Sequence, residues 1–86
     1  MIALEDIYVE CWEQNAVRYA VSREPAETVV LAAQAACETE RAAYRARAYI
    51  AMREQFGDAM VETLDHWEDR RRRGIVRRVL EERLKD

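Results

Sequence analysis

The sequence has only two glycines, one proline, one histidine and one serine among its 86 residues. Loops that cradle phosphate groups, and turns that present a nucleophilic serine, both need glycine at several fixed positions. Acid–base catalysis most often uses histidine. This composition gives no support for an enzyme, so we expect no catalytic residues and no cofactor.

Long hydrophobic runs are also missing. No stretch approaches the roughly 20 apolar residues that a membrane-spanning helix requires. The first four residues are followed at once by Glu5 and Asp6, and not by the apolar core of a signal peptide. We therefore expect a cytoplasmic protein with no membrane partner.

The two cysteines, Cys11 and Cys37, lie on separate expected helices. They lack the close spacing, such as Cys-x-x-Cys, that metal-binding and redox pairs show. Free thiols in a reducing compartment are the simpler interpretation. The cysteines therefore predict no metal site.

Hydrophobic residues make up 50% of the chain and charged residues 36%. This balance is typical of a folded helical protein and argues against disorder. Apolar residues recur at spacings of three and four and do not alternate as in a strand. We predict one all-α domain over residues 1–86, with helices over about 3–22, 26–56 and 59–84. The helices should form an antiparallel three-helix bundle, or a helical hairpin with a third helix, with the middle helix longest.

Four residues predict where the helices begin and end. Pro25 suits the first turn of the middle helix, because its missing N–H would have no partner there. Gly57 suits the left-handed position that ends many helices, and Asp58 suits the cap of the next one. Gly74 permits either a continuous last helix or a break, and we favour a continuous or gently kinked helix.

The middle helix has two apolar sides separated by charged stripes. Nearly half of its positions between Leu31 and Ala51 are alanine. One side consists of Leu31, Ala32, Ala35, Ala42, Ala43, Ala46, Tyr49 and Ile50. The other consists of Val30, Ala33, Cys37, Tyr44, Ala48 and Ala51. Because a helix with one neighbour needs only one apolar stripe, this pattern predicts that the middle helix is sandwiched.

The surplus of apolar helix surface suggests a function. We expect a non-enzymatic protein–protein interaction module of the adaptor, accessory or inhibitor type, a class that includes small phage proteins. It would bind a larger protein or a second copy of itself, as a homodimer. No motif identifies a family. The expected interaction surface is Val30, Tyr44, Tyr49, Val76, Leu80 and Leu84.

An arginine-rich segment gives the alternative function. As a helix it would offer nucleic-acid phosphates a basic patch made of Arg70, Arg71, Arg73, Arg77 and Arg78. The simpler interpretation is local pairing at (i, i+4) spacing. The expected pairs are Glu68 with Arg72, Asp69 with Arg73, and Glu81 with Lys85.

A group of carboxylates surrounds the single histidine. Glu62, Asp65, His66 and Asp69 would share one side of the last helix, at spacings that helical metal sites use. That side lies largely opposite the apolar stripe, which places it in solvent. We therefore expect no metal here either.

Overall fold

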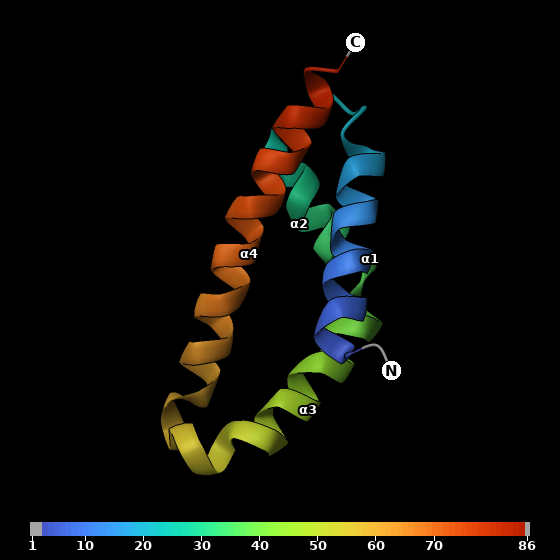
Figure 1. The fold of residues 1–86 in the computed structure, drawn as a ribbon. Coiled ribbons are helices and arrows are strands. Elements are labelled where there is room, and N and C mark those ends of the chain that lie inside the picture. The colour runs from blue at the N-terminus through green and yellow to red at the C-terminus, as the bar shows by residue number, and fades with distance from the viewer. Residues whose placement is uncertain (1–2, 86) are drawn as a thin grey trace.

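The computed structural model describes residues 3–85, which form four α-helices and one short 3-10 turn (Figure 1). No strand occurs among these residues, so the all-α prediction is confirmed. The molecule is elongated and measures 48 × 25 × 17 Å. In chain order the elements are α1 (Leu4–Tyr19), α2 (Ala26–Ala36), α3 (Glu38–Phe56), η1 (Gly57–Ala59) and α4 (Met60–Arg83).

The helix α4 runs along most of the length of the molecule (Figure 1). The helices α1 and α2 pack against α4 from about Trp67 to its C-terminal end, and α3 continues from α2 toward the opposite end. There η1 turns the chain back into α4. The expected three arms are therefore present, with α2 and α3 together forming the middle arm.

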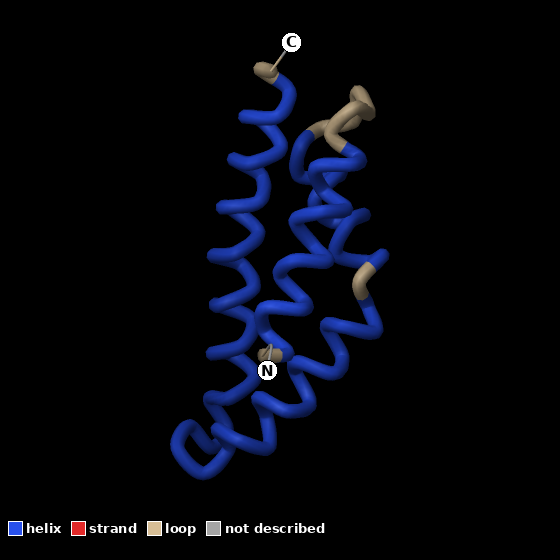
Figure 2. Tube along the Cα trace, turned by 45° about the vertical axis from the view of Figure 1, so that its right-hand side comes forward, coloured by secondary structure: helices blue, strands red, loops and turns tan. Residues whose placement is uncertain are grey.

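The middle arm is not the single helix that the sequence predicted. It breaks at Cys37, whose φ of −109° and ψ of 28° are not helical (Figure 2). The Cys37 N–H donates to the carbonyl of Gln34, three residues back, at 3.0 Å. The helix restarts at once, because the Cys37 carbonyl accepts from the Arg41 N–H at 2.9 Å. Neither glycine nor proline marks this break, so its cause lies in tertiary contacts.

One of these contacts is a disulfide between Cys11 and Cys37, which corrects the prediction of two free thiols. It joins α1 to the junction of α2 and α3 across a sequence separation of 26 residues. Closing a loop of that length stabilises the fold by about 3–4 kcal/mol in the chain-entropy model. The argument from free thiols to a reducing compartment therefore fails, and the cytoplasmic location stays a prediction.

The main core lies between α1, α2 and the C-terminal half of α4. Its largest enclosed side chain is Trp12, whose indole N–H donates to the Val30 carbonyl at 2.9 Å. Tyr8 stacks on Trp12 with ring centroids 5.4 Å apart, and Tyr44 lies 4.9 Å from Trp67. A smaller second cluster, near η1, contains Ala48, Met60 and Leu64.

The predicted boundary residues behave in different ways. Gly57 follows α3 with a positive φ of +54°, which favours glycine as expected, but its ψ of −130° lies outside the left-handed helical region that the sequence predicted. Asp58 does not cap α4, because η1 intervenes and the helix begins only at Met60. The helix α4 continues through Gly74 without a break.

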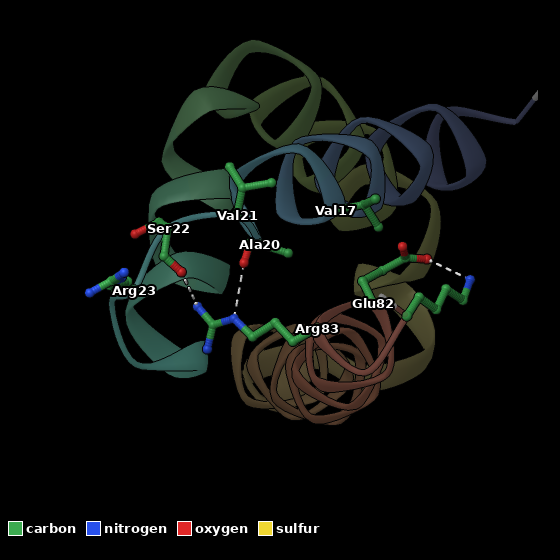
Figure 3. A pocket seen from close by; sticks show the side chains of 8 residues that line it. Val17, Ala20, Val21, Ser22, Arg23, Glu82 and Arg83 are labelled. Carbon is green, nitrogen blue, oxygen red and sulfur yellow. Dashed lines mark hydrogen bonds and ion pairs between the residues drawn. The ribbon is translucent and has the colours of Figure 1, made fainter.

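The turn between α1 and α2 is held by a side chain from the C-terminal end of α4, about 60 residues later in the sequence. Arg83 donates to the carbonyls of Ala20 and Ser22 at 3.0 and 2.8 Å (Figure 3). It also donates to the carbonyl of Glu24 at 2.6 Å. The C-terminal carbonyls of a helix have no partner within the helix and attract positive charge. Arg83 binds one such carbonyl, that of Ala20 at the end of α1, and two carbonyls of the following loop, and so fixes α4 to the turn.

Replacing Arg83 with glutamine should lower the free energy of unfolding by about 2–3 kcal/mol, because several charge-assisted hydrogen bonds are lost. Urea unfolding followed by circular dichroism measures this change. Arg78→Gln is the matched control, since the Arg78 pair with Glu82 lies near the surface and should contribute less than about 1 kcal/mol. Equal stability of the two variants would show that Arg83 does not fix the turn.

Candidate functional site

The most organised polar group in the molecule is a cluster around the carboxylate of Glu68, which is only 2% exposed. The Tyr8 hydroxyl donates to it at 2.5 Å and the Gln34 amide at 2.9 Å. Arg41 donates to both carboxylate oxygens, at 2.7 and 3.1 Å, and Arg45 adds a further charge-assisted bond. The cluster therefore joins side chains from all four α-helices.

Burial and charge act in opposite directions on the pKa of Glu68. Burial alone would raise it, but hydrogen bonds from Arg41 and Tyr8 and the charges of Arg41 and Arg45 outweigh that effect. The pKa of Glu68 falls from 4.5 to about 2. Burial, together with the hydrogen bond to Glu68, raises the pKa of Tyr8. Glu68 is therefore a carboxylate and Tyr8 a neutral phenol at every physiological pH.

This cluster is suited to holding helices together and not to chemistry on a substrate. Both oxygens of Glu68 already accept hydrogen bonds from the protein, and the side chain has almost no contact with solvent. A buried carboxylate is stable only where such partners offset its lost hydration. We assign the Glu68 cluster a structural role.

The pH dependence of stability tests this assignment. Because the folded protein lowers the pKa of Glu68, its stabilising effect is complete above pH 4.5 and is lost as the pH falls toward 2. The full shift corresponds to about 3 kcal/mol. Urea unfolding measures the free energy of unfolding at each pH. Between pH 6 and pH 3 this free energy should fall by more than protonation of the other carboxylates explains.

The variant Glu68→Gln isolates the contribution of the Glu68 carboxylate to the stability of the fold. It should be less stable than wild type by about 3–5 kcal/mol at pH 7, because Arg41 and Arg45 lose their buried partner. It should also show a flatter pH profile. Glu62→Gln, an exposed change on the same helix, should keep the wild-type profile. Parallel profiles for wild type and Glu68→Gln would contradict the assigned role.

An open cavity of about 640 Å³ lies between the C-terminal ends of α1 and α4 (Figure 3). Its only hydroxyl, on Ser22, accepts a hydrogen bond from the Glu24 N–H at 3.1 Å. The guanidinium of Arg83 is bound to the carbonyls of the turn. Both groups already form hydrogen bonds within the turn, and we assign them a structural role as well.

The outward side of α2 and α3 is apolar and uncovered. All eight residues of the first predicted apolar side are exposed, with 51% of Leu31, 47% of Tyr49 and 64% of Ile50 accessible. Thr28 and Thr39, also exposed, continue the same line. The chain therefore covers only one of the two apolar sides. We call the uncovered side the neutral face, made of Thr28, Leu31, Ala32, Ala35, Thr39, Ala42, Ala43, Ala46, Tyr49 and Ile50.

The structure divides the residues predicted for an interaction surface. Val30 is fully buried, because α2 turns it toward Trp12, so it is corrected to a core residue. Tyr44 and Val76 are partly buried against the main core. The three that remain exposed are Tyr49, Leu80 and Leu84. Of these, Tyr49 belongs to the neutral face, Leu80 lies on the last turn of α4, and Leu84 follows the last residue of that helix.

The predicted arginine patch is also divided. Arg71 lies 3.7 Å from the Glu5 carboxylate and over the Trp67 ring, and Arg78 pairs with Glu82 at 3.3 Å. The exposed arginines that share the outward side of α4 are Arg70, Arg73 and Arg77, at helical positions i, i+3 and i+7.

The predicted local ion pairs have mixed outcomes. The pair of Asp69 with Arg73 is confirmed at 2.8 Å. Glu68 does not pair with Arg72, because it points inward to the arginines of α3. Lys85 binds Glu82 at 3.0 Å, and not Glu81.

The group around His66 stays dispersed. Glu62, Asp65 and His66 are exposed, and Asp65 pairs with Arg45 at 3.1 Å. Asp69 is taken by arginines of its own helix.

Sequence reasoning missed a different group, formed by the sulfurs of Cys11 and Cys37 and a carboxylate oxygen of Glu40. These atoms all lie within 4.8 Å of one another. The sequence signals were an even number of cysteines and a glutamate three residues after the second, which are too common to identify a site.

Comparison with known protein families, with curated proteins and with solved structures gives no match. Within residues 3–85, no helix is long and apolar enough to cross a membrane. The neutral face is therefore the candidate functional site, on the evidence of its own composition and exposure.

Proposed function

We propose that this protein is a helical protein–protein interaction module whose binding surface is the neutral face of α2 and α3. The observation that supports this proposal is the absence of charge along that face. Charged residues make up 36% of the chain, yet none lies on this exposed line between Thr28 and Ile50. By contrast, the outward side of α4 carries Arg70, Arg73 and Arg77.

The side chains of the neutral face suit another helix as its partner. Leu31, Tyr49 and Ile50 offer large apolar groups, and contiguous exposed patches of this kind usually mark interaction sites. The intervening alanines allow two helix axes to approach to about 8 Å, the low end of the usual range. A partner helix would therefore cover apolar surface without removing any charge from water.

A second copy of the chain is the partner that this pattern fits. In an antiparallel pair of α3 helices with a twofold axis at Ala46, Ala42 lies opposite Ile50 of the second copy, and Ala43 lies opposite Tyr49. Each large side chain then meets a small one, and no charged residue stands at the centre of the contact. Such self-complementarity is what a twofold interface requires.

Light scattering after size-exclusion chromatography tests this proposal. The wild-type protein should elute as a dimer that dissociates on dilution. The variant Ala46→Glu should weaken the dimer at least tenfold, because two unpaired carboxylates would be buried at the axis. Ala51→Glu, the same change at an exposed position off the neutral face, should dimerise like wild type.

A crosslink tests the geometry independently. Both native cysteines are paired, so Ala46→Cys introduces one free thiol, and two such thiols would meet at the axis. Mild oxidation should convert this variant, but not Ala51→Cys, into a covalent dimer. A wild-type monomer at about 100 µM, or equal crosslinking of the two variants, would overturn the proposal.

A second candidate function rests on the outward side of α4, where Arg70, Arg73 and Arg77 form an exposed row. Nucleic-acid binding through this row predicts an affinity that weakens steeply with salt. Replacing all three arginines with glutamine should then reduce the salt slope by about three for a mixed-sequence duplex. Arg71→Gln, at a position held by Glu5 and Trp67, is the control. Absence of binding at low salt excludes this candidate.

That the protein is not an enzyme stays a prediction, as do its adaptor, accessory or inhibitor role and its cytoplasmic location. What supports a binding function over catalysis is the burial of Glu68, Tyr8 and Gln34, which leaves the polar groups of these three side chains almost no access to a substrate.

A further inference from the structure

The disulfide lies beside Glu40, and one carboxylate oxygen of this residue lacks a hydrogen-bond partner. Oε2 of Glu40 is buried, and among the described residues it finds no hydrogen-bond donor. One carboxylate oxygen of Glu40 lies within 4.8 Å of the sulfurs of both Cys11 and Cys37. A buried carboxylate oxygen without a donor is costly, so its position calls for an explanation.

The disulfide itself is no substitute for the missing donor. Its two sulfurs carry no hydrogen, so they offer Glu40 nothing to accept. Reduction changes this, because two thiols have protons to donate and two thiolates have charge for a cation. The surroundings of Glu40 are therefore better matched to the reduced sulfurs than to the oxidised pair.

We infer that Cys11, Cys37 and Glu40 form a zinc site in the reduced protein, which the disulfide replaces on oxidation. Two thiolates and one carboxylate are ligands that Zn²⁺ accepts, with water in the fourth position of a tetrahedron. Soft sulfur ligands favour zinc over magnesium or calcium. The ligands come from α1, from the junction of α2 and α3, and from the first turn of α3.

The neighbouring amide of Asn15 supports this assignment. Its Nδ2 donates to the Cys11 carbonyl at 2.9 Å and lies 3.6 and 3.5 Å from the two sulfurs. Hydrogen bonds from a second shell orient metal ligands and tune their basicity. An amide aimed at both sulfurs would stabilise negative charge on thiolates.

A dithiol reductant converts the disulfide form of the protein into the form with two free thiols. Two electrons and two protons from a dithiol cleave the S–S bond and give two thiols, while the reductant becomes a disulfide. Zn²⁺ then displaces the two thiol protons, which pass to solvent, and forms two Zn–S bonds. Binding should therefore weaken as the pH falls.

Cobalt(II) provides a direct probe, because thiolate coordination gives it a charge-transfer absorption that aqueous cobalt lacks. The protein is reduced, freed of the reductant without air and titrated with Co²⁺. We expect one Co²⁺ per chain, displaced by one Zn²⁺, and no such absorption from the oxidised protein. Circular dichroism follows the fold, and if reduction unfolds the chain, the metal should restore its helicity.

Variants distinguish this site from two thiols acting alone. Cys11→Ser should abolish the absorption. Glu40→Gln should weaken Co²⁺ binding at least tenfold, because an amide is a poorer ligand than a carboxylate, whereas the exposed Glu38→Gln should bind like wild type. Failure of the reduced protein to bind Co²⁺ one to one, or wild-type affinity in Glu40→Gln, overturns the inference.

Discussion

The arrangement of the four helices depends on the carboxylate of Glu68. Its burial would be prohibitive without Arg41 and Arg45, and both arginines come from α3. Their inward direction fixes the rotation of α3 about its own axis. Once these two positions face α4, helical geometry places Ala42, Ala46 and Ile50 on the outside. The neutral face is therefore a consequence of the polar cluster as much as of the alanine content.

Local rules were sufficient for the fold class and for most helix ends. Pro25 precedes the first residue of α2 and Gly57 follows the last residue of α3, as their backbone preferences predict. The periodicity of three and four also separated the buried side of the middle arm from the exposed one. It could not tell which of the two sides the chain itself covers, because that choice depends on which helices pack against the arm.

The residues that sequence reasoning misplaced are those governed by distant partners. Cys37 lies in a stretch without helix-breaking residues, so the sequence gives no sign of the break. The break is explained by the bond from Cys37 to Cys11 and by the contacts of the α3 arginines with Glu68. Glu68 falls in a polar run that reads as solvent-exposed, yet its hydrogen-bond partner Tyr8 is 60 residues away. Periodicity describes one helix at a time, and these contacts belong to pairs of helices.

The two proposals meet at Cys37, which is both a sulfur ligand and the joint between α2 and α3. The angle at this joint determines how the two halves of the neutral face are aligned. Zn–S bonds of about 2.3 Å hold two sulfurs about 3.8 Å apart in a tetrahedral site, so a bound metal would keep α1 tethered to the joint after reduction. Free thiols would leave the joint to packing alone. Disulfide and zinc are thus alternative ways to preserve the same face, one for oxidising and one for reducing surroundings.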